Sequence, residues 1–135
     1  MESQLSKTRF LVLRKTPYGE TSLIVAGLSP DHGQLRFMLR GARRVGRRHF
    51  PVADIFRLLD IQFRKTNKDL RHWQSAESIE DYREIARQQS LLTAGMWIAR
   101  FALLNVLEDQ DCPVFFSAMV ATLNRLRTSV LQPPA

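Results

Sequence analysis

The sequence has a single cysteine, Cys112, among its 135 residues, and this scarcity excludes two kinds of stabilising framework. One thiol cannot form an internal disulfide, and with scattered histidines it cannot complete a zinc site. His32, His49 and His72 each lack a second metal ligand three or four positions further along the chain. We therefore expect no metal or other cofactor, and a reducing, cytoplasmic location.

Long hydrophobic runs and secretion signals are also missing. The longest apolar stretch, Ile98 to Leu107, is interrupted by Arg100 and Asn105 and is too short to span a bilayer. The first ten residues, MESQLSKTRF, lack the charged and then apolar pattern of a signal peptide. The sequence thus predicts a soluble chain with no membrane segment.

Catalytic signatures are absent as well. We find no paired carboxylates and no nucleophile elbow, and residues 41–46 (GARRVG) lack the lysine of a P-loop. Tyr18, Gly19 and Glu20 resemble a site at first sight, but a glycine bend beside an acidic side chain explains them. We expect a protein that is not an enzyme. A small basic nuclease that uses His49 is the enzymatic alternative.

Positive charge, in contrast, is abundant and unevenly distributed. The formal net charge is +7, from 20 Lys and Arg against 13 Asp and Glu. Residues 1–78 contain 15 basic and 7 acidic side chains, whereas residues 79–135 contain 5 and 6. All of the excess positive charge therefore lies in the first half, as expected when one half of a protein meets a polyanion.

Six arginines occur within residues 36–48, and Asp54 is the acidic residue that follows them most closely. A guanidinium group makes paired hydrogen bonds to phosphate oxygens and stacks on flat bases, so this cluster favours nucleic-acid binding. Three aromatic side chains, Tyr18, Phe50 and Trp73, are candidate platforms on which bases stack. Alternatively, each of them packs beneath a loop. The predicted nucleic-acid-binding residues are Arg36, Arg40, Arg43, Arg44, Arg47, Arg48, His49, Tyr18 and Trp73.

The first half has the alternating pattern of short antiparallel strands. In residues 34–40, apolar side chains occupy one face, while Arg36, Met38 and Arg40 occupy the other. Phe37 and Phe63 fall on core faces. A long loop at 41–53 holds the remaining arginines of the cluster. Strands are predicted at 7–16, 21–28, 34–40, 55–65 and 70–77.

The second half has the pattern of helices. Residues 83–107 predict one helix, which is so apolar that it should be buried on more than one side. A second helix is expected from about Asp111 to Thr128, with Pro113 in its first turn. The fold class is therefore α+β: a five-stranded OB-like β-barrel in residues 1–79, followed by an α-helical hairpin in residues 80–135. An SH3-like barrel is the competing topology.

Several short motifs in residues 7–50 occur together in a familiar order. They are TRFLVLRKTPYGETSLIV, His32-Gly33 before a strand, and Gly41-Ala42-Arg43-Arg44. In this order they resemble the N-terminal domain of the RecO recombination-mediator family. The resemblance implies an OB-fold followed by a helical domain, binding of single- and double-stranded DNA, strand annealing and loading of the RecA recombinase. It also implies two partners, the RecR protein and the acidic C-terminal tail of single-stranded-DNA-binding protein (SSB).

The chain departs from that family in two respects. Family members are usually longer, and many carry a cysteine-rich zinc element, whereas this sequence has only Cys112. We expect a fragment or a reduced form that acts as a non-enzymatic DNA-binding and strand-annealing module in DNA repair. The alternative is a protein-interaction module in which the basic surface or a helical groove receives the acidic SSB tail. Its candidate cations are Arg100, Arg125 and Arg127.

Overall fold

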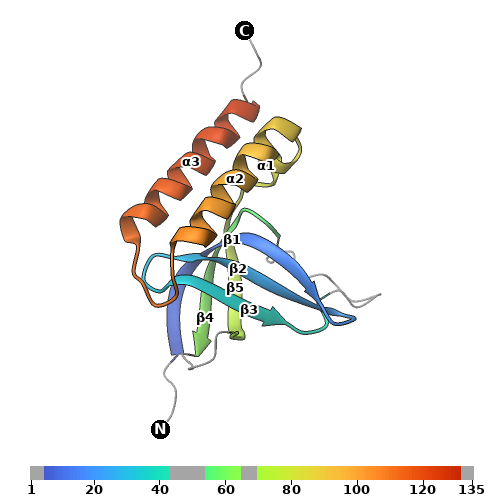
Figure 1. Ribbon diagram of the computed structural model, residues 1–135, viewed down its shortest axis with the longest axis vertical. Helices are drawn as coiled ribbons and strands as arrows, with labels where there is room; N and C mark the ends of the chain where they lie inside the picture. Colours follow the sequence, from blue (N-terminus) through green and yellow to red (C-terminus); the bar gives the residue numbers. More distant parts are fainter. Residues whose placement is uncertain (1–4, 43–53, 65–69, 132–135) are drawn as a thin grey trace.

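The computed structural model describes residues 5–42, 54–64 and 70–131, and the first half of the chain forms a five-stranded β-barrel (Figure 1). Neighbouring strands are antiparallel and follow the order β3-β2-β1-β4-β5. All five strands overlap the predicted ones. They are β1 (Leu5–Tyr18), β2 (Ser22–Ser29), β3 (Gly33–Leu39), β4 (Arg57–Arg64) and β5 (Trp73–Asp81).

The barrel closes between β3 and the residues that precede β5. The N–H of Met38 donates to the carbonyl of Arg71 over 2.8 Å, and the N–H of Arg71 donates to the carbonyl of Arg36 over 3.0 Å. These bonds form a parallel bridge between Phe37 and Arg71. The order β4-β1-β2-β3 is a Greek key, and a five-stranded Greek-key barrel is the OB arrangement. The OB-like fold is therefore confirmed over the SH3-like alternative.

Strand β1 contributes to two hydrophobic cores because its side chains alternate between opposite faces. Phe10 and Val12 point into the barrel, where they pack with Phe37 and Phe63, both confirmed as core residues. Leu11 and its neighbours on the same face instead pack under the helices. Strand β1 therefore packs against the barrel interior on one face and against the helical half on the other.

Close packing of β1 and β2 depends on Gly27. A Cβ atom at this position would lie 2.0 Å from the carbonyl oxygen of Leu11 and 2.8 Å from the ring of Phe10. The pairing register of β1 with β2 shifts at this place, between Val12 and Arg14. Only a residue without a side chain fits between the two strands at this irregularity.

The predicted helix at 83–107 is in fact two helices, α1 (Arg83–Ala86) and α2 (Gln89–Asn105). Gln88 separates them, with an extended backbone at φ −112° and ψ 125°. No glycine or proline marks this break in the sequence. Tyr82 and Ile85 are both buried in the core beneath the helices, so packing sets the direction of α1. The second predicted helix is confirmed as α3 (Pro113–Leu131).

The expectation that the apolar helix is buried on more than one side was wrong. Only small residues of α2 are buried, namely Gly95, Ala99 and Ala102. Large side chains on its other faces are open: Trp97 is 67% exposed and Leu104 is 71% exposed. Small residues bring α2 close to the barrel, and Gly95 leaves room for the ring of Phe56, which lies 2.7 Å from where a Cβ would be.

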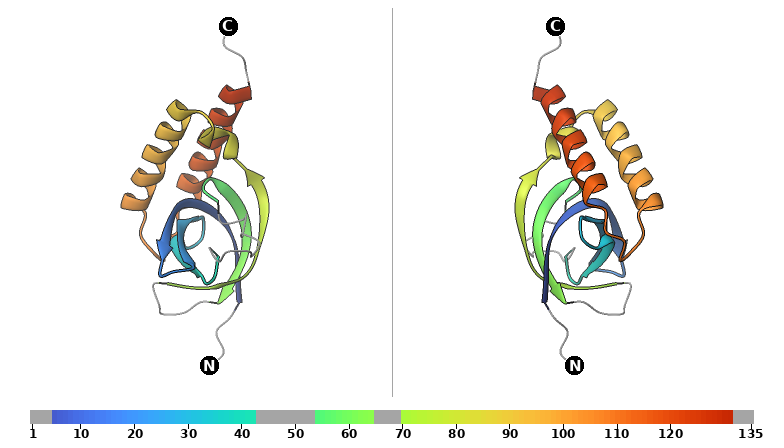
Figure 2. Two further views of the ribbon diagram at one scale, coloured as in Figure 1. Left: turned by 90° about the vertical axis from the view of Figure 1, so that its right-hand side faces the viewer. Right: turned by 90° about the vertical axis from the view of Figure 1, so that its left-hand side faces the viewer.

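The segment between α2 and α3 binds the helices to the barrel at the β2–β3 turn (Figure 2). The N–H of Asp109 donates to the carbonyl of His32 over 2.9 Å, and that of Cys112 donates to the carbonyl of Pro30 over 2.8 Å. The side-chain amide of Gln34 donates to the carbonyls of Leu103 and Val106. The end of α2 and the start of α3 are thereby held to the barrel rather than left to solvent.

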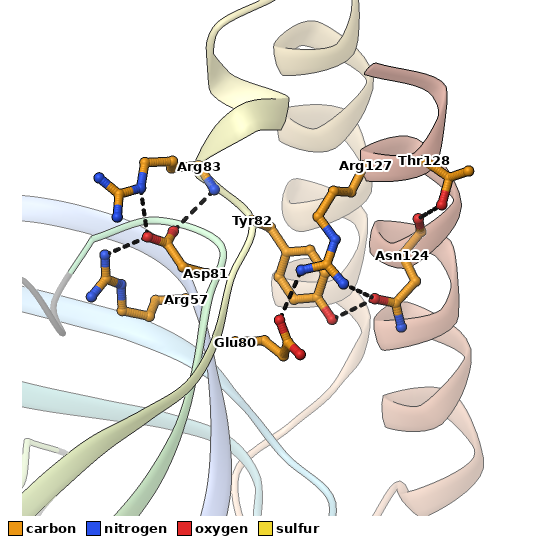
Figure 3. Close-up of polar contacts among 8 residues, drawn as sticks. All are labelled: Arg57, Glu80, Asp81, Tyr82, Arg83, Asn124, Arg127 and Thr128. Atoms are coloured by element: carbon orange, nitrogen blue, oxygen red, sulfur yellow. Dashed lines mark hydrogen bonds and ion pairs between the residues drawn. The ribbon is translucent and has the colours of Figure 1, made fainter. Parts of the chain in front are cut away.

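A second junction lies where β5 enters the helical half (Figure 3). The hydroxyl of Tyr82 donates to Asn124 on α3 over 2.9 Å, and Arg127 lies above the Tyr82 ring while pairing with Glu80 over 2.8 Å. Burial raises the pKa of the Tyr82 hydroxyl, although the nearby Arg127 charge offsets part of the rise. The predicted boundary between residues 79 and 80 falls inside β5, next to this junction.

Candidate nucleic-acid interface

The side of the barrel that faces away from its core carries arginines on β1 and β3, in register across the intervening strand β2. Residues paired across antiparallel strands share one face of a sheet. Arg14 pairs with Ala26, which pairs with Arg36. The β1–β3 outer face is formed by these rows and comprises Arg14, Thr16, Tyr18, Ile24, Arg36, Met38 and Arg40.

The arginines on this face are spaced across a surface wide enough for a nucleic-acid strand. Arg14 and Arg36 are two strands apart, about 10 Å, and Arg36 and Arg40 are four residues apart along β3, about 13 Å. A DNA strand carries one phosphate about every 3.4 Å along its axis. Figure 1 shows the β1–β2 turn and the end of β3 projecting away from the helix pair, so this part of the face is open.

Within the described ranges, no carboxylate forms an ion pair with Arg14, Arg36 or Arg40. Asp54 lies in the chain just beyond the arginine cluster, but it pairs with Lys15 over 3.0 Å. Arg57, in contrast, is nearly buried and pairs with Asp81 over 2.7 Å. Positive charge is therefore neutralised at the junction with the helices and left unbalanced on the β1–β3 outer face.

The two aromatic candidates in the described chain occupy different surroundings. Tyr18 lies at the end of β1, is 54% exposed, and precedes Gly19, which has a positive φ of 60°. Trp73 is partly buried against the barrel core, where its ring centroid lies 5.3 Å from that of Phe37. Tyr18 thus belongs to the β1–β3 outer face, and Trp73 lies at the edge of the barrel wall.

Arg40 and Trp73 are nevertheless close together, because both line one cavity of about 350 Å³. The cavity lies between the end of β3 and the start of β5, and His72 also lines it. The remaining residues that were predicted to bind nucleic acid lie outside the described residues. They are Arg43, Arg44, Arg47, Arg48 and His49, and the stacking candidate Phe50 lies outside as well.

A second candidate surface is an apolar groove of about 510 Å³ between β1 and α2. Leu13, Met96 and Leu103 contribute its apolar lining, and Arg14 and Arg100 are the cations beside it. Of the three predicted partner-binding cations, Arg100 alone lines this groove. Arg125 is exposed on α3, and Arg127 pairs with Glu80 at the junction shown in Figure 3.

Comparison with known families decides where this chain belongs. The model of the family described as Recombination protein O N terminal matches residues 1–82, more than half of the chain. The chain belongs to this family. The resemblance noted from the motifs in residues 7–50 is thereby confirmed.

Curated RecO relatives extend the similarity into the helical half. The chain is 27% identical to a protein of Synechococcus elongatus over 126 residues, 93% of this chain and 47% of the relative. It is 30% identical over 122 residues to proteins of Bacillus velezensis and Bacillus subtilis, in each case 90% of this chain and 48% of the relative. All three relatives are named DNA repair protein RecO. The chain spans about half the length of the relatives that it matches.

The lone thiol of this RecO-family chain, Cys112, is packed beside the β2–β3 turn and lies 3.4 Å from the carbonyl oxygen of Ser29. Burial, and secondarily the charge of Asp111, raises the pKa of this thiol. The described residues contain no group of three potential metal ligands. None of the helices in that part of the chain is long and apolar enough to cross a bilayer.

Sequence reasoning missed Arg14 as a member of the candidate interface of this RecO-family chain. Arg14 and Lys15 are adjacent, and the sequence alternation of this strand does not show which of them lies on the same face as Arg36. The shift in register between Val12 and Arg14 places Arg14 opposite Ala26, on the same face as Arg36. Only the strand pairing reveals this alignment, because β-bulges leave no reliable mark in a single sequence.

Proposed function

We propose that this chain is a DNA-binding and strand-annealing module of a RecO-type recombination mediator, and that it acts in DNA repair without covalent chemistry. The observation that carries the proposal is the unbalanced positive charge of Arg14, Arg36 and Arg40 on one face of an OB-like barrel. OB-folds bind oligonucleotides across the face of strands 2 and 3. The names of the RecO relatives, which are DNA repair proteins, support the same function.

The proposed mechanism is electrostatic. Two complementary strands repel one another through their phosphates, and arginines on the β1–β3 outer face would screen that repulsion while leaving the bases free to pair. Arg43, Arg44, Arg47 and Arg48 lie three to eight positions after Arg40 in the sequence and would extend the contact. Since phosphates carry no sequence information, we expect binding to both single- and double-stranded DNA with little sequence preference.

The rate of annealing of two complementary oligonucleotides tests this function. We expect the combined substitution Arg43→Ala/Arg44→Ala/Arg47→Ala to slow annealing at low salt and to weaken its dependence on salt, and Arg36→Ala/Arg40→Ala to do the same. The control matched to Arg36→Ala/Arg40→Ala is Arg87→Ala/Arg125→Ala, which removes two exposed charges from the helical half. Annealing that proceeds at the wild-type rate in both variants at every salt concentration would refute the proposal.

A second function is supported by the groove between β1 and α2. Its apolar lining and its two flanking cations, Arg14 and Arg100, complement a peptide that is acidic with an apolar end. The acidic SSB tail that the family resemblance implies has this chemistry. A RecR-like protein is the other partner implied by the resemblance, and no described feature singles out a surface for it.

Separate substitutions distinguish the two functions. Arg100→Ala should weaken binding of a synthetic SSB-tail peptide and leave oligonucleotide binding unchanged, whereas Arg40→Ala should do the reverse. Fluorescence anisotropy of a labelled peptide and a labelled oligonucleotide measures both effects. If the peptide binds and the oligonucleotide does not bind even at low salt, the chain is an interaction module and the DNA-binding proposal is wrong.

A further inference from the structure

The cavity between β3 and β5, hereafter the β3–β5 slot, has a chemistry that differs from that of the open arginine face. Its volume of about 350 Å³ is at the lower end for ligand pockets, which are roughly 300–1,000 Å³. Aromatic, apolar and cationic side chains meet in it. The residues that matter for the inference are Leu39, Arg40, His72, Trp73, Ser75 and Ala76.

The slot exists because the pairing of the two strands stops early. Beyond the bridge between Phe37 and Arg71, the described residues show no further pairing between β3 and β5. The register of β5 on β4 also shifts here, from Ser75 opposite Gln62 to Trp73 opposite Phe63, so that one residue of β5 is unmatched. Such bulges re-aim side chains and are frequent beside binding sites.

The bulge places Trp73 opposite a buried residue of the barrel, and the core holds its ring in place. The ring centroid lies 5.3 Å from that of Phe37, tilted by 39°, and 6.3 Å from that of Phe10, nearly perpendicular to it. The same side chain is partly exposed and lines the slot. A ring that is already immobilised loses little conformational entropy when a ligand stacks on it.

We propose that the β3–β5 slot takes one unpaired nucleobase of single-stranded DNA, with the base stacked on Trp73 and an adjacent phosphate bound by Arg40. This inference rests on the proposed DNA-binding function and adds a preference for one form of DNA. Arg40 is exposed at the end of the slot and makes no ion pair within the described chain, so it is available to a phosphate. A base in a duplex reaches such a slot only by leaving its stack, which costs free energy.

The chain offers a direct reporter for this contact, because it contains only two tryptophans. Trp97→Phe, at an exposed position of α2, leaves Trp73 as the sole tryptophan emitter without altering the slot. The experiment titrates this variant with three labelled ligands at low salt: an oligodeoxythymidylate, a duplex of equal length and an abasic oligonucleotide of equal length. Anisotropy of the label reports binding, and tryptophan emission reports contact with a base.

We expect the oligodeoxythymidylate to quench Trp73 in parallel with the rise in anisotropy, and the duplex and abasic ligands to bind with little quenching. The abasic strand should bind about 5- to 150-fold more weakly than the oligodeoxythymidylate, as expected for the loss of one stacked base. Arg40→Ala should weaken the binding of both the oligodeoxythymidylate and the abasic strand, because it removes a phosphate contact.

Two other outcomes separate the inference from the function on which it rests. If the oligodeoxythymidylate binds while the emission of Trp73 does not change, or if the abasic strand binds equally well, the slot takes no base and the inference is wrong, although DNA binding stands. If no ligand changes the anisotropy at low salt, the proposed function fails. Trp73→Phe, which keeps an aromatic ring, should retain most of the affinity, whereas Trp73→Leu, which removes the ring, should bind the oligodeoxythymidylate no more tightly than the abasic strand. Equal affinity of these two variants for the oligodeoxythymidylate would contradict stacking on Trp73.

Discussion

Replacing the three arginines of the β1–β3 outer face, Arg14, Arg36 and Arg40, should change how DNA affinity responds to salt. Each arginine that neutralises a phosphate of a single strand contributes about −0.7 to the slope of log K against log salt concentration. Seven arginines, these three and the four between residues 43 and 48, predict a wild-type slope of about −5. Arg14→Ala/Arg36→Ala/Arg40→Ala should therefore lower its magnitude by about 2.

The difference is large enough to measure. Between 50 and 200 mM salt, a change of 2 in the slope means that the wild-type chain loses about 16-fold more affinity than the triple variant. Anisotropy of a labelled oligodeoxythymidylate, titrated at five salt concentrations, measures both slopes. The control Arg83→Ala/Arg87→Ala/Arg125→Ala removes the same charge from the helical half. If the control changes the slope as much as the triple variant does, net charge and not the barrel face governs binding, and the reasoning fails.

Three further predictions concern other parts of the molecule. Gly27→Ala should lower the free energy of unfolding by about 3 kcal/mol or more in urea titrations, because its Cβ would overlap the carbonyl of Leu11; a smaller loss than 1 kcal/mol would contradict that packing. Tyr82→Phe should cost about 1 kcal/mol, since it removes the hydrogen bond to Asn124. The raised pKa of Tyr82 predicts that stability is unaffected by this group below pH 10 and falls above it, where the unfolded chain ionises first. Tyr82→Phe should lessen that alkaline loss of stability. If the free energy of unfolding falls equally in both proteins between pH 8 and 11, Tyr82 is not its cause.

The barrel was predictable because its strands are amphipathic. In β3 the alternation of Leu35, Arg36 and Phe37 predicts one buried face and one outer face, and the structure has Leu35 and Phe37 buried and Arg36 half-buried. The turn residues SPDHG at 29–33 indicated where β2 ends and β3 begins, and the apolar alternation of residues 55–65 indicated β4. The closure between Phe37 and Arg71 could not be read from the sequence, because it joins residues that are far apart in the chain and shows no local signal.

The helical half was less predictable. Nothing between residues 81 and 94 indicates that α1 ends before Gln89, and burial of Tyr82 and Ile85 determines the break. High apolar content in α2 suggested complete burial. The structure buries its small residues, and leaves large ones such as Trp97 exposed, since only small side chains allow the helix to approach the barrel closely.

The candidate interface was predictable only in part. Arg36 and Arg40 were found because strand alternation places them on the outer face, whereas Arg14 required the pairing of β1 with β2. The cavity shared by Arg40 and Trp73 depends on a bulge in β5, which brings together residues that are 33 positions apart. Residue type and alternation indicated which side chains are exposed, and only the folded chain indicates which of them are neighbours.

The central claim is that guanidinium groups on the β1–β3 outer face contact DNA. Nuclear magnetic resonance of the arginine Nε–Hε groups tests it directly in a chain of 15.6 kDa. On titration with an oligodeoxythymidylate, the signals of Arg14, Arg36 and Arg40 should shift, while those of Arg57 and Arg83, which pair with Asp81, should stay in place. Unshifted signals from all three arginines of the face, under conditions in which the oligonucleotide is bound, would contradict the account.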